Sequence, residues 1–314
     1  MVMDIGFGIW NMWEVWKEGY MDIYTINKAS LKTSLLKWVP DYDSAADEYS
    51  KAATCFRVGK SYKESKECLM KASENYLQNG SLFHAAKCMD QAIIMSKEMG
   101  DTSDMFKLTM KASHYYQQHG SSGSASLLLN KAADMLQQSD PESAIKLLKE
   151  ASNISGIEDS TGQAMEYTHK VARLLVKLKR YEEAENEIKR QFDLVSEGGP
   201  TSNMGRVTVE LFLLQLAKDD YVAAKKVLHE YGMQYCEQAE IYMLDSIVNA
   251  YSDHDSAQIR KMLNSPFIKH MDVEFAILAK SLADKWAVEP KEQVTNIDNE
   301  ETESSPADFG GTLC

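Results

Sequence analysis

Two short stretches of the sequence contain parts of phosphate-binding motifs. The run Gly59–Ser61, Gly-Lys-Ser, matches the end of a P-loop, but the earlier glycine that a P-loop requires would fall at Thr54. Gly6 and Gly8 begin a dinucleotide-binding GxGxxG motif, and Asn11 stands in place of its third glycine. Because neither motif is complete, and no strand is predicted before the first, we predict no nucleotide site.

Metal-ligating and nucleophilic patterns are also incomplete. His84 and Cys88 have the i, i+4 spacing that lets two ligands share a metal on one helix face, but no second pair accompanies them. The dipeptide His229-Glu230 lacks the second histidine of a zinc-protease motif, because position 233 is methionine. No nucleophile stands beside a base. We therefore predict no catalytic residues, no metal and no cofactor, and interpret the protein as a non-enzyme.

The most regular pattern is a repeat of about 20 residues. Alanine marks one column of it, at Ala52, Ala72, Ala92, Ala112, Ala132, Ala151 and Ala172. A second column of small residues consists of Ala45, Ser65, Ala85, Ala125, Ala144, Ala164 and Ala184. Small residues let neighbouring helix axes approach to about 8–10 Å, so both columns are interpreted as packing positions.

Each repeat unit fits one helix of roughly 14–16 residues and a short turn. Gly80, Gly100 and Gly120 recur between the alanine columns, and Gly80 and Gly120 sit where a helix C-terminus favours a residue with positive φ. Asp140-Pro141 and Asp219-Asp220 are typical helix starts. The predicted fold is all-α: a right-handed α-α superhelix of TPR-like helix hairpins, with about 20 residues per helix, followed by a C-terminal helical bundle.

Four parts of the chain are predicted. Residues 1–30 form an atypical, tryptophan-rich N-terminal segment, and residues 31–197 form the helical-hairpin repeat domain. The glycines and proline near 198–200 separate the repeats from a helical bundle over residues 198–287. Residues 288–314 are acidic and poor in apolar groups, so we expect a disordered tail that ends in Gly-Gly-Thr-Leu-Cys.

Composition narrows the possible partners. The 314 residues carry a formal net charge of −13, which argues against general binding to nucleic acid phosphates. The five cysteines are an odd number without a CxxC pair, which favours reduced thiols in the cytoplasm. No stretch is apolar for long enough to suggest a membrane-spanning helix.

Several stretches resemble the gamma-type soluble attachment proteins of vesicle fusion (SNAPs). These stretches are Leu35–Phe56, Gly80–Cys88, Asp219–Leu228, Asn264–Asp272 and the terminal Gly-Gly-Thr-Leu-Cys. The resemblance implies a non-catalytic adaptor that binds syntaxin-type SNARE coiled coils and recruits the hexameric NSF ATPase, which then separates the bundle. It also implies a chain that is monomeric alone, binds in several copies per SNARE complex, and is cytoplasmic and peripheral to Golgi, ER or endosomal membranes.

The same resemblance implies three sets of contact residues. A membrane-contact loop is expected at Leu35, Leu36, Trp38 and Val39, and an NSF-contact tail at Phe309 and Leu313. SNARE contacts are expected at Lys170 and Arg206. The basic set is thin, because Glu166 reverses the charge of one family position and Leu127 occupies another. The family's usual first helix is not recognisable before Lys32.

The thin basic set leaves a second hypothesis open. A helical-repeat scaffold could tether other trafficking or cytoskeletal proteins without stimulating NSF, since solenoids offer long surfaces to elongated partners. The two hypotheses differ in whether removing the tail before Phe309 abolishes stimulation of the ATPase.

Overall fold

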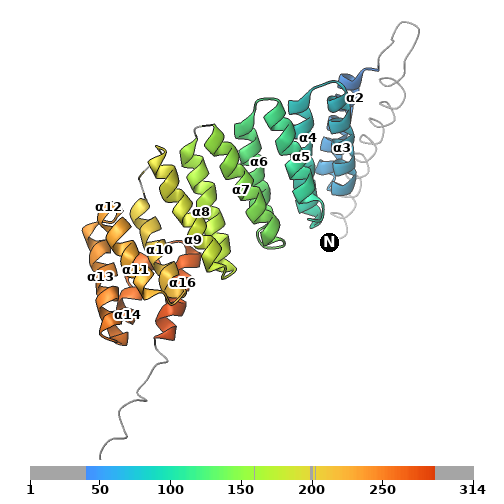
Figure 1. The fold of residues 1–314 in the computed structure, drawn as a ribbon. Helices are drawn as coiled ribbons and strands as arrows, with labels where there is room; N and C mark the ends of the chain where they lie inside the picture. The colour runs from blue at the N-terminus through green and yellow to red at the C-terminus, as the bar shows by residue number, and fades with distance from the viewer. Residues whose placement is uncertain (1–39, 159, 199–200, 202, 287–314) are drawn as a thin grey trace, which may run out of the picture.

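A computed structural model of the chain describes residues 40–158, 160–198, 201 and 203–286. Every regular element within these residues is a helix (Figure 1), which confirms the predicted all-α superhelix of helix hairpins. The repeat helices are α2 (Tyr42–Val58), α3 (Tyr62–Gln78), α4 (Leu82–Met99), α5 (Met105–Gln118), α6 (Ser122–Leu136), α7 (Pro141–Ile157), α8 (Thr161–Lys177) and α9 (Tyr181–Ser196). The C-terminal helices are α10 (Met204–Ala217), α11 (Tyr221–Val227), the π-helical turn η1 (Leu228–Gly232), α12 (Met233–Tyr235), α13 (Gln238–Ser252), α14 (Ser256–Leu263), α15 (Pro266–Lys269) and α16 (Val273–Lys285).

The repeat helices pack in chain order. Each of them contacts the next from α2 to α9, and α4 also contacts α6 as α5 contacts α7. Helices two apart in sequence are therefore neighbours, so the even-numbered and odd-numbered helices form two layers along the array (Figure 1).

Both small-residue columns lie in the contact between helices. Every member of the two columns is at most 1% exposed, from Ala45 and Ala52 at one end to Ala172 and Ala184 at the other. Buried serines add polar links across the helix pairs. Ser65 donates to the carbonyl of Ala53 at 2.8 Å, and Ser73 donates to that of Ala85 at 3.0 Å. The columns therefore serve packing, as predicted.

The helix ends follow the predicted turn chemistry. Gly80, Gly100 and Gly120 have φ of 73°, 71° and 82°, the left-handed region in which glycine carries no Cβ penalty. Asp140 and Asp220 accept hydrogen bonds from the backbone N–H groups of Ser143 and Ala223.

The C-terminal helices close on the end of the repeat array. Helix α10 is buried on nearly all sides, and α16 returns along the chain to contact both α8 and α10. One buried apolar core runs from Ala86 in α4 to Ala283 in α16, across the region near residue 197. The division of the chain into domains at that point stays a prediction.

The helix that starts after Asp219-Asp220 is not α-helical throughout. It is α-helical from Tyr221 to Val227, and Leu228–Gly232 then forms a π-helical turn. Gly232 has no side chain there, and a Cβ on it would lie 2.9 Å from Cδ1 of Leu228. The short helices α12 and α15 were not predicted, because three or four residues carry no periodic signal.

Several predictions fall outside the described residues. They concern the segment 1–30, the loop residues Leu35, Leu36, Trp38 and Val39, and the tail residues Phe309 and Leu313. Among the helices that the structure describes, none is both long and apolar enough to cross a membrane.

Candidate functional site

Polar bridges join helices of the same layer at intervals of about 40 residues, which is two repeat units. In the even-numbered layer, Lys131 of α6 contacts Asp90 of α4 at 2.9 Å. In the odd-numbered layer, Lys149 of α7 contacts Glu187 of α9 at 2.7 Å, and Arg180 contacts Glu142 at 2.5 Å. Because most of these pairs are partly exposed, each adds little stability, but together they fix the register of successive hairpins.

Lys170, the first expected SNARE contact, lies in α8 on the even-numbered layer. Its ammonium donates to Oδ1 of Asn130 at 2.7 Å and lies 3.5 Å from Asp134 and 3.9 Å from Glu166. Its side chain is 26% exposed. The positive charge is thus partly neutralised by acids of the chain itself, which lowers the attraction it offers to an acidic partner.

The surroundings of Lys170 are mixed in character. Leu127 on α6 is 57% exposed, and the side chain of Glu166 on α8 is mainly exposed. A cavity of about 160 Å³ lies between α6, α8 and the start of α16, lined by Asp134, Lys170 and Glu274 among others. We name the exposed side of α4, α6 and α8 with these residues the even-layer face. It combines an apolar side chain with charges of both signs.

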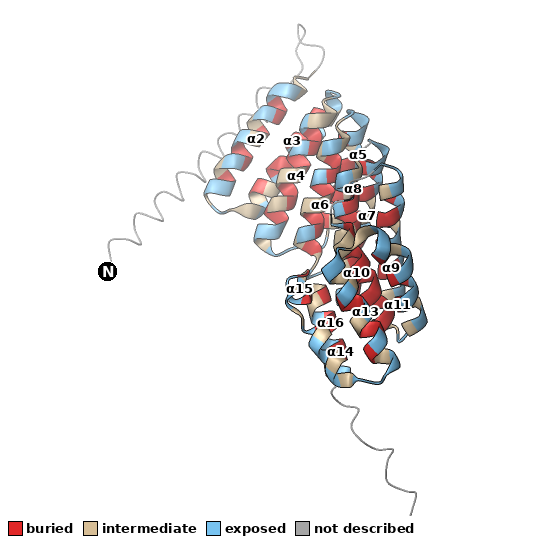
Figure 2. Ribbon diagram, turned by 90° about the vertical axis from the view of Figure 1, so that its left-hand side faces the viewer, coloured by how far each residue is buried: buried red, intermediate tan, exposed pale blue. Residues whose placement is uncertain are grey.

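Arg206, the second expected SNARE contact, lies at a different place, in the first turn of α10. Its guanidinium donates to the carbonyl oxygen of His270 at 3.1 Å. Arg206 therefore holds the turn between α15 and α16 to α10. No contact joins it to Lys170 in the described part of the chain. Figure 2 shows the repeat helices and the C-terminal helices meeting at an angle, with α15 close to the bend.

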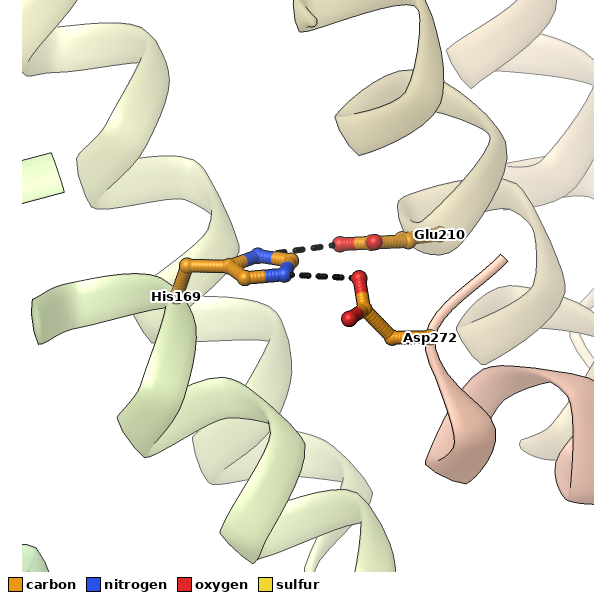
Figure 3. Close-up of side chains that lie close together, drawn as sticks. All are labelled: His169, Glu210 and Asp272. Atoms are coloured by element: carbon orange, nitrogen blue, oxygen red, sulfur yellow. Dashed lines mark hydrogen bonds and ion pairs between the residues drawn. The ribbon is translucent and has the colours of Figure 1, made fainter. Parts of the chain in front are cut away.

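A cluster of titratable side chains lies where α8, α10 and α16 meet. Nδ1 of His169 is 3.4 Å from a carboxylate oxygen of Glu210, and Nε2 of His169 is 3.1 Å from Oδ2 of Asp272 (Figure 3). Arg173, one turn further along α8, contacts Asp272 at 3.2 Å and Glu274 at 2.8 Å. We call His169, Arg173, Arg206, Glu210, Asp272 and Glu274 the junction cluster.

Glu210 is the most constrained member of the junction cluster. Its side chain is 0% exposed, and neither of its oxygens has a hydrogen-bond donor among the described residues. Burial raises the pKa of Glu210 well above its usual range, with Asp272 adding to the effect. Burial also lowers the pKa of His169. The hydrogen bond from His169 and the nearby Arg173 lower the pKa of Asp272, although burial opposes them.

The junction cluster fits a proton better than a metal ion. Ligand atoms of His169, Glu210 and Asp272 lie within 4.8 Å of one another. However, the two ring nitrogens face different carboxylates, whereas one imidazole offers a given ion only one nitrogen. Arg173 and Arg206 also place two positive charges beside the carboxylates, which disfavours a divalent cation.

Sequence reasoning missed this cluster, although one signal was present. Glu210 interrupts the apolar run from Val207 to Leu214, and an acid within a buried helix needs a partner. Its partner His169 and the third member Asp272 are 103 residues apart along the chain, so no local pattern joins them.

The fold defines an α-solenoid protein, a class that presents elongated surfaces to partners. Within that class, the sequence model of the family described as "Soluble NSF attachment protein, SNAP" matches residues 27–265. The chain belongs to this family.

Individual relatives agree with this assignment. A gamma-soluble NSF attachment protein of Dictyostelium discoideum is 27% identical over 254 residues, which cover 80% of this chain and 78% of the relative. The gamma-type protein of Arabidopsis thaliana is 25% identical over 258 residues, covering 80% and 87%. An alpha-type protein of Vitis vinifera is 25% identical over 196 residues, covering 60% and 66%. The resemblance to the gamma type is therefore confirmed.

One solved structure resembles the chain weakly. A structure titled as a functional characterization of Pseudomonas aeruginosa pilF is 17% identical, with a TM-score of 0.34, and covers 76% of this chain and 99% of its own.

Proposed function

We propose that the protein is a non-catalytic adaptor that binds SNARE coiled coils and recruits the NSF ATPase to separate them. The observation that carries the proposal is membership of the soluble NSF attachment protein family over residues 27–265. The described fold supports it, because an elongated two-layer array can lie along a rod-shaped bundle. We further propose that the chain is monomeric alone and that several copies surround one bundle.

The proposed SNARE contact is the even-layer face around Lys170. The two acids and the amide that surround the ammonium weaken this contact, so we expect moderate affinity with a measurable dependence on salt. Lys170→Ala should lower affinity for a preassembled SNARE bundle, and raising the salt concentration should lower wild-type affinity more than that of the variant.

The matched control is Lys146→Ala. Lys146 is an exposed lysine on α7, in the odd-numbered layer, so the substitution removes the same charge from the other side of the array. If the two variants lost equal affinity for the SNARE bundle, the loss would come from the change in net charge. That result would contradict a contact at the even-layer face.

The proposed NSF contact is the C-terminal tail with Phe309 and Leu313. The test is ATP hydrolysis by purified NSF on a preassembled SNARE complex, with wild-type chain, Leu313→Ala and the neighbouring control Thr312→Ala. We expect stimulation by the wild type and by Thr312→Ala, and its loss for Leu313→Ala while SNARE binding is kept. Absence of both stimulation and recruitment by the wild type would remove the adaptor proposal.

The proposed membrane contact is the loop with Leu35, Leu36, Trp38 and Val39, which would hold the adaptor peripherally on cytoplasmic membrane surfaces such as those of Golgi, ER or endosomal vesicles. The free energy of apolar side chains in a loop falls when they leave water and enter the bilayer interface. Trp38→Ala should reduce co-flotation with phospholipid vesicles, and Trp13→Ala, which removes the same side chain from the segment 1–30, should not. A reversed pattern would assign membrane contact to the N-terminal segment instead.

A scaffold without NSF stimulation is the second candidate, and the neutralised environment of Lys170 favours it. In that case the chain would bind neither the SNARE bundle nor NSF at micromolar concentration, and the hydrolysis assay above would distinguish the two functions.

A further inference from the structure

The junction cluster joins three segments that are distant in sequence. His169 and Arg173 come from α8, Arg206 and Glu210 come from α10, and Asp272 and Glu274 come from the start of α16. Their contacts hold the first turn of α16 against the last even-numbered repeat helix and against α10. Figure 3 shows the contacts of His169 with Glu210 and Asp272. The docking of α16 on the repeat array therefore depends on the charges within this cluster.

The charges of the junction cluster do not balance. With a neutral imidazole, the carboxylates of Glu210, Asp272 and Glu274 outnumber the guanidiniums of Arg173 and Arg206 by one. The surplus negative charge is most costly on Glu210, because this side chain is fully buried and its oxygens have no hydrogen-bond donor. A single proton would cancel the surplus charge and give Glu210 a hydrogen bond to make.

We infer that one proton, shared between Glu210 and His169, latches α16 to the repeat array, and that its release loosens this docking. In the latched state the carboxylic acid proton of Glu210 faces Nδ1 of His169, which lies 3.4 Å from a carboxyl oxygen of Glu210. The Nε2–H group of the same ring donates to Asp272 across 3.1 Å. The proton on Glu210 thereby fixes the ring tautomer that binds the start of α16.

Loss of the proton to solvent weakens both contacts of His169, the one with Glu210 and the one with Asp272. A carboxylate at Glu210 faces the lone pair of Nδ1, which is repulsive unless the ring proton moves to that nitrogen. If the ring proton moves, Nε2 no longer donates to Asp272. In either case a buried charge or a broken bond remains, and α16 detaches more often from α8 and α10.

The latch is a property of the chain alone, so its test needs no partner. Hydrogen exchange of the full-length protein, corrected for the intrinsic effect of pH, is followed from pH 6.5 to 8.5 in buffer with EDTA. We expect the opening constant of α16 to rise by up to about tenfold per pH unit as long as the closed state holds the proton of Glu210 and the open state does not, while that of α3 stays constant.

Two variants define the outcome. Glu210→Gln is neutral at every pH and keeps a donor for Nδ1, so opening of its α16 should not depend on pH. Glu187→Gln neutralises another buried acid, which lies on α9 and pairs with Lys149, and it should behave like the wild type. A wild type without pH dependence, or a Glu210→Gln variant with the wild-type slope, would overturn the latch.

Two further measurements cover the remaining outcomes. If Glu210→Gln does not fold, the carboxyl ¹³C resonance of Glu210 in the wild type decides, and an ionised carboxylate at pH 7 contradicts the proposal. Calorimetry with Zn²⁺ in the absence of EDTA tests the metal alternative. If one equivalent of Zn²⁺ bound and this binding required Glu210, the cluster would hold a metal ion rather than a proton. That result would overturn the inference.

Discussion

Alanine at the repeat positions determines how closely successive helices approach. Ala112 in α5 is 0% exposed and belongs to the continuous core. Ala112→Leu would add atoms where no space exists, and overpacking of this kind costs about 1–3 kcal/mol. We expect the midpoint of denaturant unfolding to fall accordingly.

The matched control for this substitution is Leu127→Ala. Leu127 is large but 57% exposed, so its truncation should change the free energy of unfolding by no more than about 0.5 kcal/mol. A larger loss for Leu127→Ala than for Ala112→Leu would mean that the small-residue column does not set the helix spacing.

The junction cluster makes the stability of the whole chain depend on pH. The pKa of Glu210 is raised in the folded state, mainly by burial, so its contribution to stability is lost as pH rises toward that folded pKa. The lowered pKa of His169 acts in the opposite direction, and only below its usual value of 6.5. The two effects offset each other just below pH 6.5.

Above pH 6.5 only the Glu210 effect remains, so stability should fall with a slope of up to about 1.4 kcal/mol per pH unit. The window should end near pH 8, because burial raises the pKa of the Cys68 thiol to about 11 and adds a similar slope at higher pH. Urea unfolding at pH 6.5, 7.0, 7.5 and 8.0 measures the slope. Glu210→Gln should remove it, and an unchanged slope would assign it to other groups.

At the scale of single elements, turns whose left-handed residue is not glycine were harder to predict than those in which it is. Lys60, Lys179 and Asp219 have φ of 59°, 60° and 60°, the same left-handed conformation that Gly80 and Gly120 adopt. The glycines identified their turns from sequence, because glycine is the residue that favours this conformation. The other three positions carried no such signal.

Replacing the residue by glycine at one of these turns should therefore raise the free energy of unfolding. Lys60→Gly removes a Cβ strain of about 1–2 kcal/mol, and the greater freedom of glycine in the unfolded chain offsets about 0.5–1 kcal/mol of it. We expect a net gain of about 0.5–1 kcal/mol. Gly80→Lys is the reciprocal control at the next turn, where φ is 73°, and it should lose a similar amount. Thermal unfolding of both variants measures the pair of effects, and a loss for Lys60→Gly would contradict the argument.

The helices themselves could be predicted from sequence because their signals are local. The alanine columns and the caps at Asp140 and Asp220 each act within one or two turns of a helix. The π-helical turn at Leu228–Gly232 and the junction cluster are different, since both depend on packing between distant segments. A single buried acid, Glu210, was the one local sign of the cluster.

At the scale of the whole molecule, the buried apolar side chains of the residues that the structure describes form two clusters rather than one. The first contains buried residues of α2, α3 and part of α4, from Ala45 to Met95, and the second extends from Ala86 to Ala283. In repeat proteins stability is approximately a sum of local terms and neighbour interfaces. The first hairpin should therefore open without the rest of the molecule.

Two matched phenylalanines test this separation. Phe56 in α2 is 1% exposed and belongs to the first cluster, whereas Phe212 in α10 is 0% exposed and belongs to the second. Truncation to alanine should cost about 3–5 kcal/mol at either site. The loss of stability should be confined to the cluster that contains the substituted residue. Phe56→Ala should therefore lower hydrogen-exchange protection in α2 and α3 and leave protection in α6 to α10 unchanged. Phe212→Ala should lower protection from α6 to α16. Equal losses across the chain for both variants would mean that the two clusters unfold as one cooperative unit.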